Sequence, residues 1–115
     1  MVVVLATLLV LVTAPKGDGN RIASELLKER VAACVNVVSG VRSSYWWENR
    51  IEEADEDLLL IKTTEAVYPR LEEVIRRVHP YKVPEVLALR VERGLAEYVS
   101  WVEGSVSPRS QESKA

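Results

Sequence analysis

The chain has 115 residues, with 15 basic and 17 acidic side chains and a formal net charge of −2 at pH 7. This length fits one domain that buries about two-thirds of its unfolded surface, so folding needs no metal or disulfide. The evenly spread charge lacks the basic stripe of a nucleic-acid-binding protein. The single cysteine, Cys34, cannot form an internal disulfide, which favours a cytoplasmic protein.

An apolar segment at residues 1–12 predicts a strand that is buried on both faces. It has no basic residue before its apolar centre, unlike a signal peptide. It is also shorter than the ~20 residues that a membrane-spanning helix needs. Its β-branched residues are typical of a strand in the middle of a helix-covered sheet, so we expect neither an export signal nor a membrane partner.

A break at residues 15–19 separates this strand from a predicted amphipathic helix that ends near residues 30–32. Apolar side chains recur there at helical spacing, at Ile22, Ala23, Leu26 and Leu27. The loop before the helix, residues 16–20, matches no phosphate-binding fingerprint, and Asp18 would repel an anion. We interpret this loop as a turn and helix cap.

Residues 34–63 predict two long strands that form a hairpin. The first strand is interrupted at Gly40, where a glycine within a strand indicates a β-bulge. The turn falls at Glu48 and Asn49, because asparagine tolerates the left-handed backbone that such turns need. The acidic run at residues 52–57 lacks the glycine and the spacing of a calcium-binding loop, and we interpret it as a solvated end of the hairpin.

A second amphipathic helix is predicted at residues 67–78, followed by a strand at residues 86–91 and a short helix at residues 97–103. The order is β-α-β-β-α-β with a closing helix. It predicts an α+β fold, a ferredoxin-like sandwich with right-handed crossovers. We expect a single domain over residues 1–106 and a polar, disordered tail over residues 107–115.

The length of the hairpin predicts an oligomer. Residues 32–47 would span ~50 Å if extended, whereas a globule of this size is about 35 Å across, so the hairpin must bend sharply or reach a neighbour. Trp46 and Trp47 point to opposite faces of the strand, so at most one can face the core of its own domain. Because tryptophans are enriched at interfaces, we favour an obligate oligomer over a folded-back hairpin.

The segment at residues 79–85 holds most of the candidate functional groups. It contains the only histidine of the chain, whose backbone is constrained by the proline that follows it. Imidazole binds copper, zinc and nickel, and it transfers protons near neutral pH. One histidine and one cysteine do not make the three- or four-ligand site of zinc within one protomer. We favour a structural, hydrogen-bonding His79, while a metal shared with Glu85 or with carboxylates of another subunit stays open.

No catalytic arrangement follows from the remaining side chains. Cys34 lies at an apolar strand entry, and we interpret it as core filling rather than as a ligand or nucleophile. Lys62, at a strand end, fits an anionic ligand and an ion pair with a carboxylate equally well. No Ser/His/Asp, Cys/His or paired-carboxylate set can be assembled from the spacing, so we do not expect an enzyme.

Six short motifs, in order along the chain, together carry a family resemblance. They are Val12-Thr13-Ala14-Pro15, Ala32-Ala33-Cys34-Val35-Asn36, Ser44-Tyr45-Trp46-Trp47-Glu48, Ile61-Lys62-Thr63, His79-Pro80-Tyr81-Lys82-Val83-Pro84-Glu85 and Tyr98-Val99-Ser100-Trp101. With these motifs the chain resembles the divalent-cation tolerance proteins of the CutA family, from about residue 8 to residue 103.

The resemblance implies a ferredoxin-like protomer in a compact homotrimer whose hairpin strands pair across subunits. It also implies a role in tolerance of copper and other divalent metals, with copper binding by members of the family, and an architecture similar to the trimeric PII signalling proteins. In some bacterial members a cysteine before the Thr-Ala-Pro segment and two adjacent histidines are taken as copper ligands. This chain has Val12 and Val78 at two of those positions and keeps only His79.

Three hypotheses of function follow. The first is a non-enzymatic trimeric metal-response protein that binds a divalent cation weakly through His79 and carboxylates at the subunit interface. The second is a PII-like sensor of a small ligand, which would use an interface cleft near His79 formed by Lys62, Tyr81, Glu85 and Trp101. The third is a structural or adaptor trimer.

Overall fold

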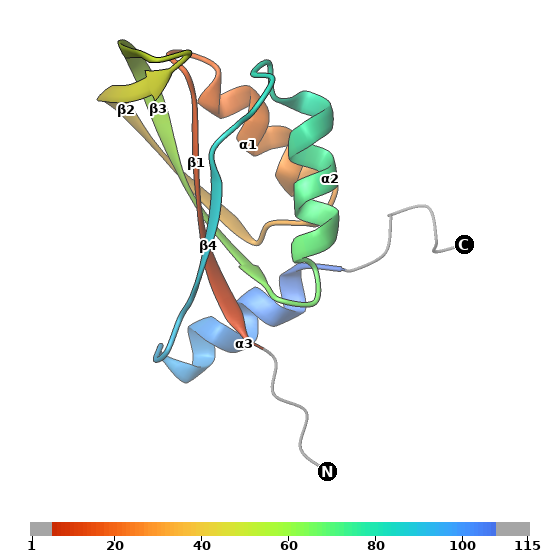
Figure 1. The fold of residues 1–115 in the computed structure, drawn as a ribbon. Coiled ribbons are helices and arrows are strands. Elements are labelled where there is room, and N and C mark those ends of the chain that lie inside the picture. The colour runs from red at the N-terminus through yellow and green to blue at the C-terminus, as the bar shows by residue number, and fades with distance from the viewer. Residues whose placement is uncertain (1–5, 108–115) are drawn as a thin grey trace.

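Seven regular elements follow one another in the computed structural model, which describes residues 6–107 (Figure 1). They are β1 (Thr7–Pro15), α1 (Gly19–Lys28), β2 (Cys34–Trp47), β3 (Arg50–Thr64), α2 (Tyr68–Val78), β4 (Val86–Arg90) and α3 (Ala96–Ser105). The predicted order of elements is confirmed, while the expectations for residues 1–5 and 108–115 lie outside the described residues. No helix in the described part is long and apolar enough to cross a membrane.

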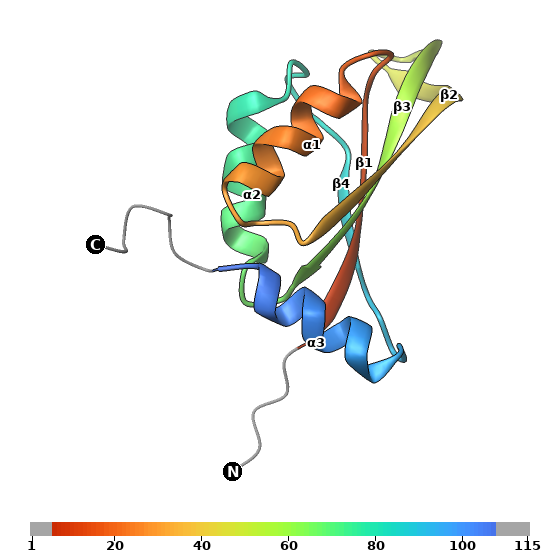
Figure 2. The same cartoon turned by 180° about the vertical axis from the view of Figure 1, so that it is seen from behind.

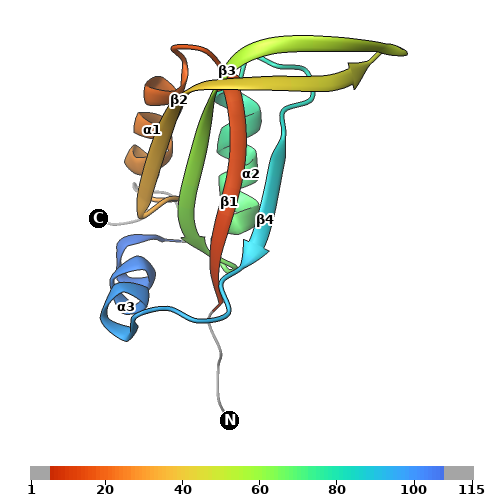
Figure 3. The ribbon, with the colours of Figure 1, turned by 90° about the vertical axis from the view of Figure 1, so that its left-hand side faces the viewer.

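The four strands form one antiparallel sheet in the order β2-β3-β1-β4. Helices α1 and α2 lie side by side on one face of this sheet (Figures 1 and 2). The view in Figure 3 looks onto the opposite face, which these two helices leave open. Helix α3 contacts β1 and β3 at the end of the sheet where β1 begins. This is the ferredoxin-like α+β arrangement that the sequence predicts.

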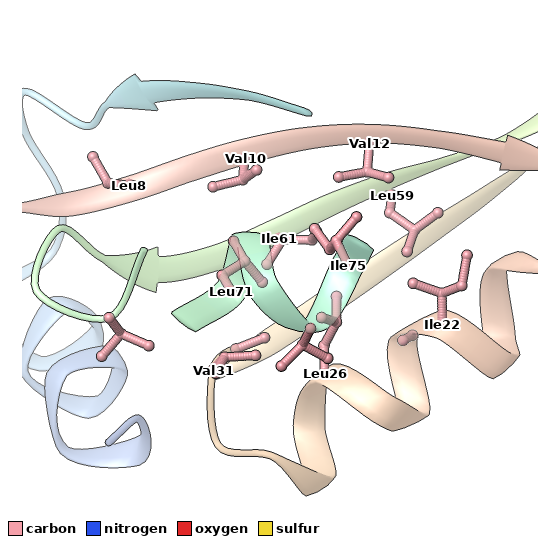
Figure 4. Close-up of a cluster of buried hydrophobic side chains, with 14 of the residues drawn as sticks. Leu8, Val10, Val12, Ile22, Leu26, Val31, Leu59, Ile61, Leu71 and Ile75 are labelled. Atoms are coloured by element: carbon pink, nitrogen blue, oxygen red, sulfur yellow. The ribbon is translucent and has the colours of Figure 1, made fainter. Parts of the chain in front are cut away.

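The core lies between the sheet and the two covering helices. Side chains alternate along a strand, so every second residue of β1 and β3 faces the helices. Each fully buried aliphatic side chain there stabilises the fold by about 1.5–3 kcal/mol relative to an exposed one. The fully buried set includes Val10, Val12, Ile22, Leu26, Leu59, Ile61, Leu71 and Ile75 (Figure 4).

The prediction that β1 is buried on both faces is wrong for a single protomer. Both crossover helices return on the same side of the sheet, so the other side has no cover from them. Leu9 and Leu11 point to this open face and are only partly buried. They pair directly with Leu89 and Leu87 of β4, which are 49% and 58% exposed. A continuous apolar surface therefore stands open on the sheet.

The hairpin of β2 and β3 bends at the predicted bulge. Its register shifts between Val38 and Val41, and Gly40 there has a left-handed φ of 79°. Beyond this point the hairpin turns toward the β4 side of the sheet (Figure 3). Glu48 and Asn49 form the predicted turn with φ values of 52° and 65°, the two positive values of a type I′ turn.

The distal half of the hairpin holds both tryptophans outside the core. Trp46 is 70% exposed and Trp47 is 46% exposed. The Cα atoms extend over 50 × 34 × 23 Å, and the longest dimension exceeds the about 35 Å expected for a globule of this length. The hairpin therefore bends and still projects, which leaves its apolar side chains without cover from their own protomer.

The prediction of a solvated end at residues 52–57 is wrong for the last two residues. Glu56 and Asp57 are only 4% and 5% exposed. Asp57 Oδ2 accepts hydrogen bonds from the backbone N–H groups of Gly17 and Gly19, at 3.0 and 2.9 Å. Those donors precede and open α1, and a buried carboxylate facing them satisfies both.

The loop at residues 16–20 forms the predicted turn, but its own side chains do not cap the helix. Asp18 occupies the N-cap position without a capping hydrogen bond. Its carboxylate instead pairs with Arg21 at 2.8 Å, and this hydrogen bond lowers the pKa of Asp18. At Gly19, an added Cβ would lie 2.8 Å from Val37 Cγ1, so glycine is what lets the loop approach the strand.

Helix α1 ends at Lys28, earlier than the predicted residues 30–32. Arg30 adopts a left-handed φ of 60°, and the N–H of Val31 returns to the carbonyl oxygen of Leu26 at 3.2 Å. This bonding pattern closes a helix at its C-terminus, usually with glycine at the left-handed position. Because arginine occupies this position instead of glycine, the sequence does not show where the helix ends.

Candidate functional site

The segment at residues 79–85 leaves α2 and turns toward the end of β1. His79, at the end of the helix, has extended backbone and is 7% exposed. Its Nε2 lies 2.8 Å from the carbonyl oxygen of Thr13, and its Nδ1 accepts the backbone N–H of Tyr81 at 3.1 Å. A carbonyl oxygen only accepts, so Nε2 carries the proton. Both ring nitrogens have protein partners, and a metal at either one would displace a hydrogen bond.

Tyr81 joins this segment to the base of the hairpin. Its hydroxyl donates a hydrogen bond to Glu56 Oε2 at 2.7 Å. Burial, followed by the adjacent carboxylate, raises the pKa of Tyr81 above its ordinary value. The phenol therefore stays protonated at neutral pH and remains a donor to Glu56. The two rings of His79 and Tyr81 lie 4.8 Å apart between centroids, which holds the start of the segment together.

A cavity of about 570 Å³ lies between this segment and the distal half of the hairpin. Its volume falls within the range of small-molecule sites. Two of the predicted ligand residues, Tyr81 and Glu85, contribute to its wall. The wall also includes Ser43, Tyr45, Trp47 and Glu56.

The other two predicted ligand residues lie at the opposite end of the sheet. Lys62 is six residues from Glu56 along β3, about 20 Å away, and its Nζ is hydrogen-bonded to Asn36 Oδ1. Trp101 lies in α3, with its ring centroid 5.5 Å from that of Tyr98. Within one protomer, the four predicted ligand residues therefore lie in two separate pairs at opposite ends of the sheet.

A larger hollow, of about 970 Å³, lies between β4 and α3. None of the predicted site residues contributes to it. Arg90, on its wall, already pairs with Glu65 at 2.8 Å. We therefore centre the candidate site on the smaller cavity, where predicted residues and a buried carboxylate meet.

A family model described as the CutA1 divalent ion tolerance protein matches residues 8–105. The chain belongs to this family. Its relatives include the divalent-cation tolerance protein CutA of Thermus thermophilus, 46% identical over 94 residues that make up 81% of this chain and 91% of that protein. Protein CutA 1, chloroplastic, of Oryza sativa is 42% identical over 86% of this chain. The chain spans 56% of the rice protein and 52% of the mouse CutA protein.

Solved CutA1 structures share the fold. The Thermus thermophilus protein superposes with a TM-score of 0.85 at 42% identity, covering 88% of this chain and 99% of that one. The Oryza sativa structure gives 0.86 at 39% identity, covering 90% and 96%. A Nostoc structure described as a PII-like protein CutA in apo form gives 0.84 at 32% identity, covering 89% and 99%. The predicted family and fold are thus confirmed.

The described part of this CutA1 protomer contains no group of three or more His, Cys, Asp or Glu side chains placed to hold a metal ion. Val12 is fully buried in the core, and Val78 is partly buried at the end of α2. Neither offers a donor at the positions where the family resemblance implies copper ligands. Residues 6–107 of one protomer therefore do not form a metal centre by themselves.

Cys34 lies outside the helix-covered core, contrary to the prediction of core filling. It is partly exposed and stands directly opposite Lys62, whose side chain faces the open side of the sheet. Burial, followed by the neighbouring Cys34, raises the pKa of Tyr98. The apolar residues before Cys34 concealed this placement, because they precede the strand and do not share its alternation.

The sequence did not reveal Glu56, the most buried acidic side chain of the site. Its one available signal was its position just before the apolar residues 58–61, within the same strand. Because alternate residues share a face, Glu56 extends the row of Leu58 and Leu60 on the open side of the sheet. Tyr81, which covers it, comes from 25 residues further along the chain.

Proposed function

We propose that this CutA1 protein is a non-enzymatic, cytoplasmic homotrimer that contributes to the tolerance of divalent metals. Copper is the first candidate metal, bound weakly rather than as a folding cofactor. The family match supports the divalent-cation role. The observation that carries the proposal is the buried carboxylate of Glu56, with Glu85 nearby, at a cavity that opens toward the uncovered hairpin.

The open face of the sheet supports the trimer. Leu87 and Leu89 are about half exposed on it, and Ile51 and Trp46 are 65% and 70% exposed on the hairpin. Apolar side chains of this extent mark an interface with another protein chain. Sedimentation equilibrium should give three times the 12.9 kDa mass of the protomer, and a stable folded monomer would exclude the proposal.

A site between subunits accommodates the separation of the predicted residues. In a closed ring of head-to-tail contacts, different surfaces of neighbouring protomers meet. Such a contact would allow Lys62 and Trp101 of one protomer to approach Tyr81 and Glu85 of the next. Within the segment, His79 would have to give up one hydrogen bond, worth about 1 kcal/mol, to bind a metal. That cost is consistent with weak binding.

Calorimetric titration of the metal-free trimer with Cu²⁺ tests the metal site. We expect His79→Ala and Glu85→Gln each to weaken binding roughly tenfold, the effect of losing about 1.4 kcal/mol of ligand interaction. Glu73→Gln serves as the matched control, because it replaces an exposed carboxylate on α2 with a carboxamide. Equal affinity of the wild type and His79→Ala would show that His79 is not a copper ligand. Equal affinity of the wild type and all three variants would show that the segment at residues 79–85 does not bind copper.

The cavity volume supports a second candidate, a PII-like sensor of a small ligand. About 570 Å³ exceeds what one metal ion requires. A thermal-shift screen of the metal-free protein with nucleotides and small anions tests this alternative. A concentration-dependent rise in Tm is expected for a true ligand. A structural or adaptor trimer would respond neither to copper nor to the screen.

A further inference from the structure

Two carboxylates face the cavity near residues 79–85 without a positive partner. Glu56 is 4% exposed, and the Tyr81 hydroxyl donates to one of its oxygens. Glu85 is exposed, with its Oε1 3.5 Å from the Thr13 hydroxyl. Neither carboxylate forms an ion pair with a Lys, Arg or His side chain of residues 6–107. A buried carboxylate without a cation carries a desolvation cost that a cationic partner offsets.

The wall of the cavity is aromatic as well as acidic. Tyr45, Trp47 and Tyr81 line it, and the first two are 42% and 46% exposed. Ring faces attract cations, with tryptophan the strongest of the three residue types. Lys82 is the one basic side chain among the described residues that line the cavity, and it is exposed to solvent. The local charge therefore favours a positive ligand.

The size of the cavity selects an organic cation over a bare metal ion. A volume of about 570 Å³ leaves most of the space to a molecule with an apolar body. We propose that this cavity binds a small primary amine in its ammonium form. The ammonium group lies between Glu56 and Glu85, and the apolar body packs against Tyr45 and Trp47. The inference shares its cavity with the proposed function but requires no bound metal.

Binding of 2-phenylethylammonium chloride to the metal-free, full-length protein tests this inference. Calorimetry should show saturable binding of the amine. 2-Phenylethanol, a neutral molecule of similar shape, should bind more weakly by a factor of roughly ten or more. Glu85→Gln and Glu56→Gln should each weaken ammonium binding by roughly tenfold. Glu73→Gln should leave it unchanged. Because Glu85 is exposed, Glu85→Gln stays informative even where Glu56→Gln disturbs folding, which circular dichroism would reveal.

Three results overturn the inference. One is equal binding of the amine and the alcohol, and another is unchanged binding in Glu85→Gln. The third is no saturable binding at all, the outcome expected where a neighbouring protomer fills the cavity. Cu²⁺ titration of the same samples separates the two proposals. Copper binding without amine binding removes this inference alone, and amine binding without copper binding removes only the metal role.

Discussion

Asp57, in β3, stabilises the start of α1, although the two are 38 positions apart in the sequence. Its carboxylate is 5% exposed and accepts the N–H groups of Gly17 and Gly19 at the start of α1. Asp57→Ala removes this acceptor and leaves two backbone donors without their partner. Hydrogen bonds to a charged group contribute about 1.5–3 kcal/mol each, and the carboxylate also faces the positive end of the helix dipole. We expect the free energy of unfolding to fall by about 3 kcal/mol.

Urea unfolding followed by circular dichroism, at one fixed protomer concentration, measures this loss. With a slope of about 1–3 kcal/mol per molar urea, the midpoint should fall by roughly 1–3 M. Asp55→Ala is the matched control, because Asp55 is exposed and lies 3.3 Å from Arg42 in a surface ion pair. A solvent-exposed pair of this kind contributes little to stability. Similar midpoints for the two variants would refute the capping role.

Gly19→Ala should destabilise the fold by about 1–3 kcal/mol, because its new Cβ would lie 2.8 Å from a valine methyl of β2. Gly104→Ala, with open space around the glycine in α3, should be neutral or stabilising in the same thermal-unfolding assay. Burial, followed by the hydrogen bond to a glutamate, raises the pKa of Tyr68 to about 12, whereas an unfolded tyrosine ionises near pH 10. The stability that this phenol contributes is therefore present below about pH 10 and lost as the pH rises toward 12, so the urea midpoint should fall over that range, and less steeply in Tyr68→Phe. Leu89→Asp on the open face should yield smaller particles in sedimentation, whereas Leu27→Asp on a helix should leave the assembly intact; equal masses would contradict an interface on that face.

The fold follows from local patterns that a sequence displays directly. The apolar, β-branched run of β1, the helical spacing in α1 and α2, and the special residues Gly40 and Asn49 each determine structure within a few neighbouring positions. Their elements are confirmed with boundaries shifted by a few residues. The end of α1 at Arg30 could not be predicted in this way, because a left-handed helix end without glycine leaves no sign in the sequence.

The candidate site depends on contacts between distant residues, and there the sequence predicts less. His79 finds its acceptor 66 residues earlier, at Thr13. Glu56 and Asp57 belong to an acidic run that indicates solvent, yet Tyr81 and the start of α1 bury them. Only the tertiary fold brings such partners together, so charge composition alone gave the wrong exposure. For the same reason, the sequence did not show that the four predicted ligand residues lie at opposite ends of the sheet within one protomer.

Crystals of the protein soaked with Cu²⁺, measured at the copper absorption edge, test the central proposal most directly. We predict an anomalous peak at the segment of residues 79–85, with Glu85 as one ligand and the others supplied by side chains of a neighbouring protomer. Anomalous density confined to exposed carboxylates elsewhere, or no anomalous density in crystals that leave the cavity accessible to solvent, would contradict the proposed metal site.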